Sequence, residues 1–483
     1  KQISEQLNIV SDFPVCGAFV NNKVRELSFD IVKPKNIRFI DYSHPDGQRM
    51  YTRSLFFVLY AAVKDLYPDA KVKIDHAISR GYYCELEGMG TTFCDSCVNE
   101  IKIRMQELID ADLPFVRQGK QLNRILEEYT ENGLDDKVGL YSESGWLYAY
   151  IYYFNNTPNY FHGHLLPSSG YIENFDIERF NGGMLLRLPS EKSITRLRDY
   201  VQQEKLFGIF REHKDWAEIL GVADIGQLNH FVKQGKSGDV IKISEALHEK
   251  KIAEIATTIS NRNPRVKLVM VAGPSSSGKT TFSKRLGVQL SVCGNKPHMI
   301  SLDNYFVDRE FTPLDEDGNY DFEALEAIDV GFFNQQLIQL INGESVELPK
   351  FSFTEGKRFF DGDLLQLKDN DVLIIEGIHA LNPDLIPLID KAITYRIFIS
   401  ALTSISIDDH NPISTTDNRL IRRTIRDAKY RGYSALETIR RWPSVRRGEE
   451  KNIFPHQENS DIMFNSALLY ELGVLKKYLE PLL

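Results

Sequence analysis

The sequence predicts an α/β protein whose C-terminal part is built on a parallel sheet with flanking helices. From residue 263 to the end, short apolar runs alternate with helical patterns, which is typical of strand–helix–strand units. One of these runs, residues 267–272, leads directly into a glycine-rich loop and then into an amphipathic stretch. The chain of 483 residues is too long for one hydrophobic core, so we expect several domains.

Four regions are expected along the chain. Residues 1–48 carry three short strand patterns, at 15–20, 24–29 and 37–40, with a tight turn at Asn21-Asn22. Residues 49–225 mix a helical pattern at 55–66 with strand patterns at 81–86 and 146–154. Residues 226–262 predict a connector that ends in a helix, and residues 263–483 form the parallel α/β domain.

The composition excludes several classes of protein. A hydrophobic content of 42% with 26% charged residues is ordinary for a globular protein, and the net charge of −9 argues against broad binding to nucleic acid. No run approaches 18 apolar residues, and the first residues do not resemble a signal peptide, so we expect a soluble, cytoplasmic protein. A homo-oligomer is compatible with the sequence.

The cysteines point to a reducing compartment. There are five, irregularly spaced, which does not suggest a disulfide scaffold. Cys94 and Cys97 form a C-x-x-C motif with no second ligand pair nearby. The motif is read as two ordinary buried thiols, with half of a metal or redox site as the alternative.

The strongest motif is Gly-Pro-Ser-Ser-Ser-Gly-Lys-Thr at residues 273–280, between a strand and a helix, which predicts a P-loop NTPase domain that binds ATP and Mg²⁺. Gly273 and Gly278 let the backbone amides turn inward as an anion nest. Lys279 supplies a charge to the β- and γ-phosphates, and the Thr280 hydroxyl is placed to bind Mg²⁺. The expected nucleotide contacts are Gly273, Ser275, Ser276, Ser277, Gly278, Lys279, Thr280 and Thr281.

Two carboxylates follow predicted strands of the same sheet. Asp303 follows residues 298–302, where it is placed to accept a proton from an attacking hydroxyl or to hold Mg²⁺; a helix N-cap is the alternative. Glu376 ends the apolar run 372–375 and is expected to be a second carboxylate associated with the metal, as opposed to a solvated glutamate at a strand end.

A cluster of arginines lies on one predicted helical face. Like charges at this spacing repel one another, so an anionic partner such as the triphosphate under a closing lid is expected. Pairing with Asp417 and Asp427 in a solvated helix is the alternative. The four arginines are Arg419, Arg422, Arg423 and Arg426.

From about residue 267 to 472 the chain resembles the uridine kinase and phosphoribulokinase family. The likeness rests on the loop and on ordered blocks at 301–306, 320–323, 348–353, 374–378 and 417–427. It implies ATP-dependent phosphorylation of a hydroxyl on a nucleoside or sugar-like small molecule. It implies Asp303 as the catalytic aspartate, with Lys279, Arg419 and Arg423 assisting transfer and Arg422 and Arg426 binding nucleotide. Expected contacts with the acceptor are Asp303, Tyr305, Phe351 and Arg358.

The expected acceptor site departs from that family. Uridine kinases usually carry a Tyr-Asp-Phe block followed by a histidine, whereas this chain reads Phe351-Ser-Phe353 and has Gly356 in place of the histidine. Loss of hydrogen-bonding groups weakens discrimination. Uridine is therefore expected to be a poor acceptor, and Arg358 would suit an anionic one.

The N-terminal half carries a second resemblance. Residues 14–48 resemble a TGS domain, a small β-grasp module, and residues 52–190 resemble the α+β editing domain of threonyl-tRNA synthetase through blocks at 61–68, 76–86 and 108–115. The family's histidine pair is replaced by Arg53 and Phe57, so we expect the fold without the editing chemistry. His162 and His164 are read as loop residues, with RNA contacts or metal ligands as alternatives.

Three functions compete at this point. The leading one is a nucleoside-type kinase with a catalytically silent N-terminal half. The others are an aminoacyl-tRNA hydrolase regulated by the P-loop, and a nucleotide-regulated RNA- or tRNA-binding protein. Asp303 discriminates among them, because a kinase needs this carboxylate near the γ-phosphate and a nucleotide switch does not.

Overall fold

The computed structural model describes residues 2–6, 9, 11–316 and 318–483. It divides the chain into two compact units, described here one at a time. Within the described residues, unit 1 consists of residues 1–203, 217–235 and 405–414, and unit 2 of residues 204–216, 236–404 and 415–483. The four regions expected from the sequence remain predictions, and the segment 405–414, which lies within the last of them, belongs to unit 1.

Unit 1 begins with a small antiparallel sheet of three strands in the order β2-β1-β3. The bounds are α1 (Gln2–Gln6), β1 (Gly17–Val20), β2 (Lys23–Glu26) and β3 (Ile37–Ile40). Asn21 and Asn22 connect β1 and β2 with φ values of 48° and 63°. Asparagine tolerates this left-handed region, so the predicted turn is confirmed. The assignment to a β-grasp module stays a prediction.

The core of unit 1 is organised around the long helix α2 (Pro45–Leu66), which extends the predicted helix at 55–66 by three turns. His44 caps the helix by accepting a hydrogen bond from the amide of Asp46 at 3.1 Å, and Pro45 occupies the first turn, where its missing N–H is not needed. Most side chains from Met50 to Val63 are fully buried. An antiparallel sheet, β4-β5-β10-β9, and a smaller one, β6-β7-β8, belong to the same unit.

The further elements of unit 1 confirm the predicted strands at 81–86 and 146–154. They are β4 (Lys71–Ile78), β5 (Gly81–Glu87), α3 (Asp95–Asp110), β6 (Val116–Gln121), α4 (Leu122–Glu131), α5 (Asp135–Ser142), β7 (Tyr148–Phe154), β8 (Thr157–Asn159), η1 (Ser169–Tyr171), β9 (Asp176–Phe180), β10 (Gly183–Arg187), β11 (Pro189–Ser190), β12 (Ser193–Leu197) and α7 (Ile225–Lys233). This mixture is the α+β organisation expected for the region. Its kinship with a synthetase stays a prediction.

A buried ionic cluster ties the segment 405–414 into unit 1. The ammonium of Lys137, which is fully buried, lies 3.0 Å from Asp136 Oδ2, 3.2 Å from Asp408 Oδ1 and 3.0 Å from His410 Nδ1. Burial alone would lower the pKa of Lys137, but Asp136 and Asp408 raise it, whereas burial holds the pKa of His410 well below its usual range. Lys137 is therefore a buried cation whose counter-charge comes partly from residues 405–414.

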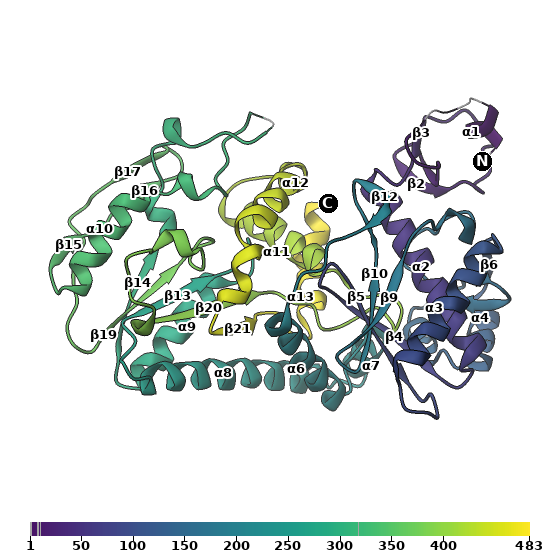
Figure 1. Cartoon of the computed structure of the whole chain (residues 1–483), viewed down its shortest axis with the longest axis horizontal. Helices are drawn as coiled ribbons and strands as arrows, with labels where there is room; N and C mark the ends of the chain where they lie inside the picture. Colours follow the sequence, from purple (N-terminus) through teal and green to yellow (C-terminus); the bar gives the residue numbers. More distant parts are fainter. Residues whose placement is uncertain (1, 7–8, 10, 317) are drawn as a thin grey trace. The chain divides into compact units, whose positions relative to one another are not determined.

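Unit 2 contains a parallel sheet of five strands in the order β14-β19-β13-β20-β21 (Figure 1). Its strands are β13 (Leu268–Ala272), β14 (Lys296–Ser301), β19 (Asp371–Glu376), β20 (Thr394–Ser400) and β21 (Ile462–Asn465). The runs predicted at 267–272, 298–302 and 372–375 are all strands of this sheet, so the predicted parallel α/β fold is confirmed. These central strands are apolar along nearly their whole length because helices and loops cover both faces of the sheet.

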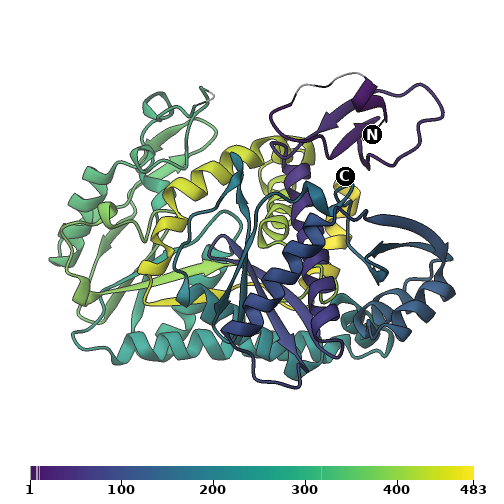
Figure 2. The ribbon, with the colours of Figure 1, turned by 45° about the vertical axis from the view of Figure 1, so that its right-hand side comes forward.

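Two helices cover one face of this sheet. The connector predicted before residue 262 ends in α8 (Ser237–Asn261), and α9 (Lys279–Val292) follows the glycine-rich loop; the two lie side by side (Figures 1 and 2). Ile252, Ile255 and Ile259 of α8 share a buried cluster with Phe282 and Leu286 of α9 and with alternate residues of the strands. Fully burying one such side chain contributes roughly 1.5–3 kcal/mol, so this cluster anchors the loop to the sheet.

The remaining elements of unit 2 lie outside the five-stranded sheet. They are α6 (Glu204–Leu220, whose last turn belongs to unit 1), η2 (Leu302–Tyr305), η3 (Arg309–Phe311), η4 (Leu325–Ala327), α10 (Val330–Ile341), β15 (Ser345–Glu347), β16 (Lys350–Ser352), β17 (Lys357–Phe359), β18 (Leu364–Gln366), η5 (Pro383–Leu385), η6 (Lys391–Ile393), α11 (Thr415–Tyr430), α12 (Ala435–Asn452), η7 (Phe454–Asn459), α13 (Glu471–Leu479) and η8 (Glu480–Leu482).

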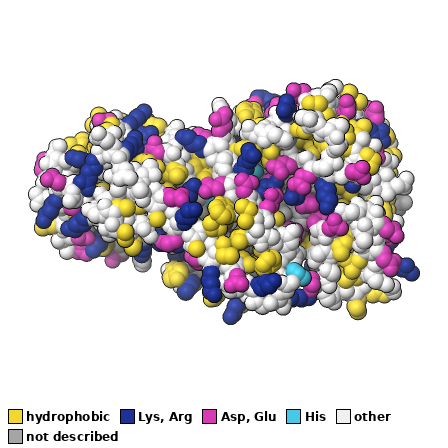
Figure 3. Space-filling view, turned by 90° about the horizontal axis from the view of Figure 1, so that it is seen from below, with side chains coloured by type: hydrophobic (Ala, Val, Ile, Leu, Met, Phe, Trp, Pro, Cys, Tyr) yellow, Lys and Arg dark blue, Asp and Glu magenta, His cyan; other side chains and the backbone are white. Residues whose placement is uncertain are grey.

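The surface agrees with the composition. On the face drawn in Figure 3, acidic and basic side chains are interspersed, and neither kind gathers over a wide area. In the part of the chain that the structure describes, no helix has the length and apolar character needed to cross a bilayer.

Candidate functional site

The glycine-rich loop joins β13 to α9, which is the context its sequence predicts. Ser276 and Gly278 adopt left-handed backbone conformations with φ values of 60° and 88°. Gly273 is needed for lack of space, since a Cβ atom there would lie 2.1 Å from the carbonyl oxygen of Ile399. Left-handed residues next to right-handed ones turn successive amides toward one point, and the first turn of α9 adds its free N–H groups. The loop is therefore shaped to hold an anion.

Lys279, the first residue of α9, folds back over this loop. Its ammonium donates hydrogen bonds to the carbonyl oxygens of Gly273 at 2.9 Å and Pro274 at 3.2 Å. Burial lowers its pKa, and the opposite charges of Asp303 and Glu376 partly offset that effect. Lys279 is thus a cation held between the loop and two carboxylates.

Those two carboxylates lie at the carboxyl ends of neighbouring strands. Glu376 ends β19 in register with Ser301 of β14, and Asp303 follows two residues later in η2. The Thr280 hydroxyl donates to Glu376 Oε1 at 2.9 Å, while Glu376 Oε2 is buried and has no hydrogen-bond partner among the described residues. Burial raises the pKa of both carboxyls, with Lys279 opposing the shift. The structure therefore brings Lys279, Thr280, Asp303 and Glu376 together.

The serines of the loop have unequal surroundings. The Ser275 amide donates to Glu449 Oε1 at 3.0 Å, and its hydroxyl accepts from Arg423 at 2.8 Å. The hydroxyl oxygens of Ser276 and Ser277 are buried without a hydrogen-bond partner within the described residues, and Thr281 is exposed on α9. Orphaned hydroxyls beside an anion-binding loop fit a ligand that is rich in acceptor oxygens. The residues present thus fit a nucleoside triphosphate and its divalent cation.

Arg419 does not lie where the sequence placed it. It was expected to face a phosphate, but its guanidinium is 1% exposed and forms a bidentate pair with Glu449 of α12, with NH2 2.8 Å from Oε2. It also donates to the carbonyl oxygen of Ser275 at 3.2 Å. A guanidinium committed to a buried carboxylate supports the loop from behind, so its expected role in transfer is corrected to one of positioning.

The other three arginines of α11 are also paired. Arg422 contacts Glu471 and donates to the Ser466 carbonyl oxygen at 2.8 Å. Arg423 and Arg426 share Asp427, at 3.3 and 2.7 Å; Asp427 is one of the partners that the alternative interpretation named, but it is buried and not solvated. Arg423 still reaches the Ser275 hydroxyl, and the charge of Arg426 acts on the pKa values of both Lys279 and Asp303. Arg419 and Arg422 also reach loop carbonyl oxygens, those of Ser275 at 3.2 Å and Ser276 at 3.5 Å, so three of the four arginines contact the loop and the fourth, Arg426, acts on it through its charge.

The expected acceptor contacts separate into two kinds. Tyr305 is 1% exposed, and its hydroxyl donates to Gln336 at 2.9 Å, so its predicted contact with substrate is corrected to a core contact. Phe351 and Arg358 are partly exposed on the β16–β17 hairpin. The ring of Phe351 packs against Phe306 with centroids 5.7 Å apart, and Arg358 donates to Asp329 at 3.0 Å.

Gly356 lies in the turn of this hairpin. Its φ is 70°, and a Cβ atom would lie 2.8 Å from Arg309 Cβ. A histidine at this position would be strained and would collide with Arg309. The backbone of the hairpin therefore favours glycine at position 356 over the histidine that uridine kinases usually carry.

Two acidic residues near the loop were not singled out from the sequence. Glu449 is fully buried and joins Arg419 to Ser275, as described above. Glu323 packs against the backbone of Gly448, and burial raises its pKa to about 7, while Arg423 acts in the opposite direction. Glu323 is the last residue of the block 320–323, on which the family resemblance partly rests, so the sequence held a signal for it. Glu449 is one of three glutamates in α12, and nothing in the sequence distinguishes it from the other two.

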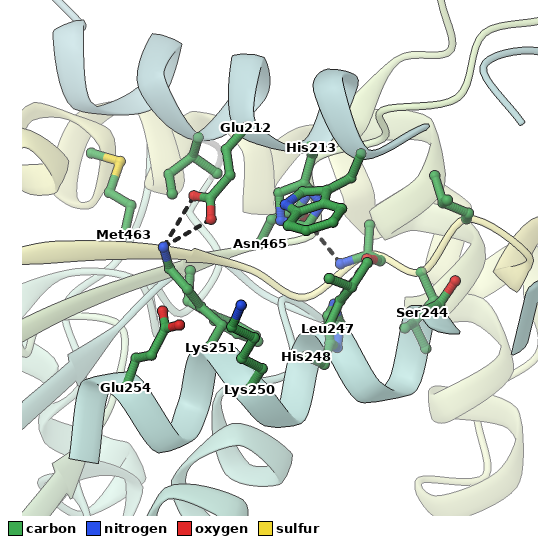
Figure 4. A pocket seen from close by; sticks show the side chains of 16 residues that line it. Glu212, His213, Ser244, Leu247, His248, Lys250, Lys251, Glu254, Met463 and Asn465 are labelled. Atoms are coloured by element: carbon green, nitrogen blue, oxygen red, sulfur yellow. Dashed lines mark hydrogen bonds and ion pairs between the residues drawn. The ribbon is translucent and has the colours of Figure 1, made fainter. Parts of the chain in front are cut away.

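A separate pocket, partly open to solvent, lies between α6, α8 and β21. Figure 4 shows Glu212 and His213 on one helix opposite Lys251 and His248 on the other. The Lys251 ammonium pairs with Glu212 at 2.9 Å, and burial lowers the pKa of His213 to about 3 and of His248 to about 4. The predicted site residues are absent from its lining.

The histidines of unit 1 are held by side chains of the same unit. His164 Nδ1 lies 3.4 Å from Glu26, and burial lowers the pKa of His162. Arg53 reaches toward the His164 carbonyl oxygen at 3.5 Å, and Phe57 packs in an aromatic cluster with a centroid 5.2 Å from that of Phe161. Among residues 2–6, 9, 11–316 and 318–483, no three His, Cys, Asp or Glu side chains are grouped to hold a metal ion.

A parallel sheet that carries this loop and these strand-end carboxylates defines the class of P-loop phosphotransferases, and the chain is an ATP-dependent kinase of a small molecule. Residues 268–468 match the Phosphoribulokinase / Uridine kinase family. A uridine kinase of Ligilactobacillus salivarius is 30% identical over 206 residues, which cover 42% of this chain and 87% of that protein. The chain belongs to the phosphoribulokinase and uridine kinase family.

Further relatives cover the same part of the chain. A uridine kinase of Halobacterium salinarum is 26% identical over 194 residues, 40% of this chain and 77% of that protein. Among solved structures, D-glycerate 3-kinase from Cryptococcus neoformans var. grubii is 14% identical, with a TM-score of 0.30, and covers 45% of this chain and 89% of its own.

Proposed function

We propose that unit 2 transfers the γ-phosphoryl group of ATP to a hydroxyl of a nucleoside or sugar-like alcohol. The observation that carries this proposal is the convergence of Lys279, Asp303 and the Thr280–Glu376 pair at one end of the sheet. In open α/β sheets this end is where ligands bind. A nucleotide switch needs the loop and the metal site, but not a second carboxylate such as Asp303 with a raised pKa.

The residues divide the chemistry as follows. The loop amides and Lys279 hold the β- and γ-phosphates, and Thr280 and Glu376 would hold Mg²⁺, which when bound offsets phosphate charge. Asp303 takes the proton of the acceptor hydroxyl while its oxygen forms a bond to the γ-phosphorus and the bond to ADP breaks. Arg423 and Arg426 stabilise charge on the transferred group once their pairs with Asp427 rearrange.

The acceptor is inferred to be something other than uridine. The hairpin that carries Phe351 has aromatic side chains that an acceptor could pack against. With Gly356 in place of a histidine, it has no imidazole there to form a hydrogen bond with a pyrimidine. Arg358 is partly buried and paired with Asp329, and an anionic acceptor would compete for its guanidinium. Another nucleoside or an anionic sugar fits these groups better than uridine does.

An ADP-release screen of the full chain tests the proposal. Wild-type protein is assayed with ATP and Mg²⁺ against nucleosides, phosphorylated sugars and pantothenate-like alcohols. We expect at least one acceptor to stimulate ADP release, Lys279→Ala to abolish it, and Lys296→Ala, which removes an exposed lysine of unit 2, to leave it intact. Retention of transfer within about tenfold of wild type by Lys279→Ala would remove this loop from the mechanism.

A second candidate function concerns unit 1. We infer that the outer face of β7 stacks the bases of single-stranded RNA, which would give the N-terminal half a nucleic-acid partner. Tyr148 and Tyr150 alternate along β7 and are 65% and 53% exposed, and the Arg117 guanidinium lies 3.6 Å from the centre of the Tyr150 ring. Exposed rings with an interleaved cation favour stacking of bases.

Fluorescence anisotropy with a labelled single-stranded oligoribonucleotide tests this second function. Replacing both tyrosines by alanine should weaken binding by at least about tenfold, since each stacked base contributes about 1–3 kcal/mol. Tyr478→Ala removes an exposed tyrosine of α13 and serves as the matched control. Equal affinity of the double variant and the control would exclude this face.

The thiols support a cytoplasmic location within this proposal. All five cysteines are free in the structure, two of them exposed or partly exposed, as is typical of proteins in a reducing compartment.

A further inference from the structure

Cys94 and Cys97 of unit 1 are brought together at the start of α3. Cys94 is the N-cap residue of this 16-residue helix, and Cys97 lies in its first turn. Their sulfur atoms are 3.0 Å apart, and both are free thiols. A disulfide bond is about 2.05 Å long, so the two sulfur atoms are about 1 Å farther apart than in a disulfide.

The two thiols differ in a way that suits exchange chemistry. Cys94 is partly exposed, and its sulfur contacts the Ser96 hydroxyl at 3.0 Å, whereas Cys97 is 7% exposed and points into the unit. Hydrogen bonds from Ser96 and Cys97 lower the pKa of Cys94 to about 7. A partly exposed thiolate attacks a disulfide, and a covered neighbour resolves the intermediate.

The other cysteines lack these properties. Cys16 and Cys84 are buried, and burial raises the pKa of each thiol. Cys293 is exposed and belongs to unit 2, whereas the other four cysteines belong to unit 1, so unit 2 offers it no second thiol. A metal site at Cys94 and Cys97 would need further ligands, and the described part of the chain groups no third His, Cys, Asp or Glu with them.

We propose that Cys94 and Cys97 form a redox-active dithiol that exchanges with small-molecule disulfides such as glutathione disulfide. The Cys94 thiolate attacks one sulfur of glutathione disulfide, the S–S bond breaks, and one glutathione thiolate leaves. Cys97 then loses its proton to solvent and attacks Cys94 Sγ, which releases the second glutathione. Two protein thiols are oxidised to one disulfide, and one glutathione disulfide is reduced to two thiols.

Glutathione redox buffers applied to the full chain with Cys293→Ser test this assignment. Intact mass and peptide mapping should show loss of two hydrogens and a Cys94–Cys97 link that reverses with excess reduced glutathione. With Cys97→Ser added, the reaction should stop at one glutathione on Cys94. With Cys94→Ser added, the covered Cys97 should remain unmodified.

The rate of alkylation by iodoacetamide provides an independent readout. Cys94 should reach half its maximal rate at about pH 7, below the value of about 8.5 for an ordinary thiol. The proposal is overturned if the Cys293→Ser protein accumulates a mixed disulfide at Cys94 without closing the Cys94–Cys97 link. It is equally overturned if the two single serine variants take up glutathione at the same rate.

Discussion

Glu449→Ala tests whether a buried ion pair supports the phosphate-binding loop. Glu449 is 0% exposed, accepts both terminal nitrogens of Arg419, and accepts the Ser275 amide at 3.0 Å. Its removal leaves a guanidinium, itself 1% exposed, without a counter-charge. Breaking a buried pair in this way costs about 3–5 kcal/mol, so we expect the free energy of unfolding of unit 2 to fall by about that amount.

Urea denaturation followed by tryptophan fluorescence measures this loss. In a Trp146→Phe, Trp216→Phe background the remaining reporter is Trp442, whose ring centre lies 5.4 Å from the Arg419 guanidinium carbon. Glu450→Ala is the matched control, because the next residue of α12 makes an exposed pair with Arg446 that contributes about 0–1 kcal/mol.

A double substitution of this ion pair distinguishes its contribution to stability from its contribution to the loop. Arg419→Met with Glu449→Leu replaces the buried pair by apolar side chains and should recover most of the lost stability. The Ser275 amide still lacks its acceptor, so ATP affinity should stay low. If Glu449→Ala costs no more than Glu450→Ala, the pair does not hold the loop and the reasoning fails.

Three further predictions concern the site. Asp303→Asn should lower kcat by about 10² or more with little change in ATP affinity. Burial raises the pKa of Asp303, and its basic form is lost as the pH falls through that pKa. The kcat of the wild type should therefore drop on the acid side of its pH profile, and Asp303→Asn should lack this drop. Collapse of ATP binding with turnover preserved would show a metal or structural role instead. Gly273→Ala should weaken ATP binding at least about tenfold by calorimetry, because its Cβ would lie 2.1 Å from the Ile399 carbonyl oxygen. Gly287→Ala in α9 should not weaken binding, because the nearest atom to its Cβ would be 3.5 Å away. Equal ATP affinities of the two variants would refute the steric argument. Uridine should show a kcat/KM below about 10⁵ M⁻¹s⁻¹ in steady-state kinetics, and a higher value would mean that residues other than Phe351 and Gly356 read the base.

The parts of unit 2 that the sequence predicts well are those specified by local pattern. The turn at residues 273–280 is predictable from its own residues. Glycine or serine occupies each position where φ is positive or where a larger side chain would collide with the backbone. Asp303 and Glu376 were predictable because parallel strands end at one edge of the sheet, which places any residue after such a strand near the loop.

The parts that the sequence predicts poorly depend on partners distant in the chain. The spacing of Arg419 gives its helical face, but not that a carboxylate thirty residues later on α12 neutralises it. Tyr305 follows Asp303 by two residues, yet the 3₁₀ turn directs its ring to Gln336 in the core. In both cases tertiary packing decides what each side chain faces, and neither periodicity nor motif spacing carries that information.

The segment 405–414 limits how the protein can be dissected. A truncated protein ending at residue 225 would retain Lys137 but lose Asp408 and His410, so a buried ammonium would lose much of its compensation. A protein beginning at residue 236 would keep the segment but lack the residues that surround it in unit 1. Truncations that split the chain between its units should therefore yield poorly folded fragments, and an inactive fragment would say little about the activity of the intact chain. Point substitutions in the full-length protein are the sounder way to assign functions to the two halves.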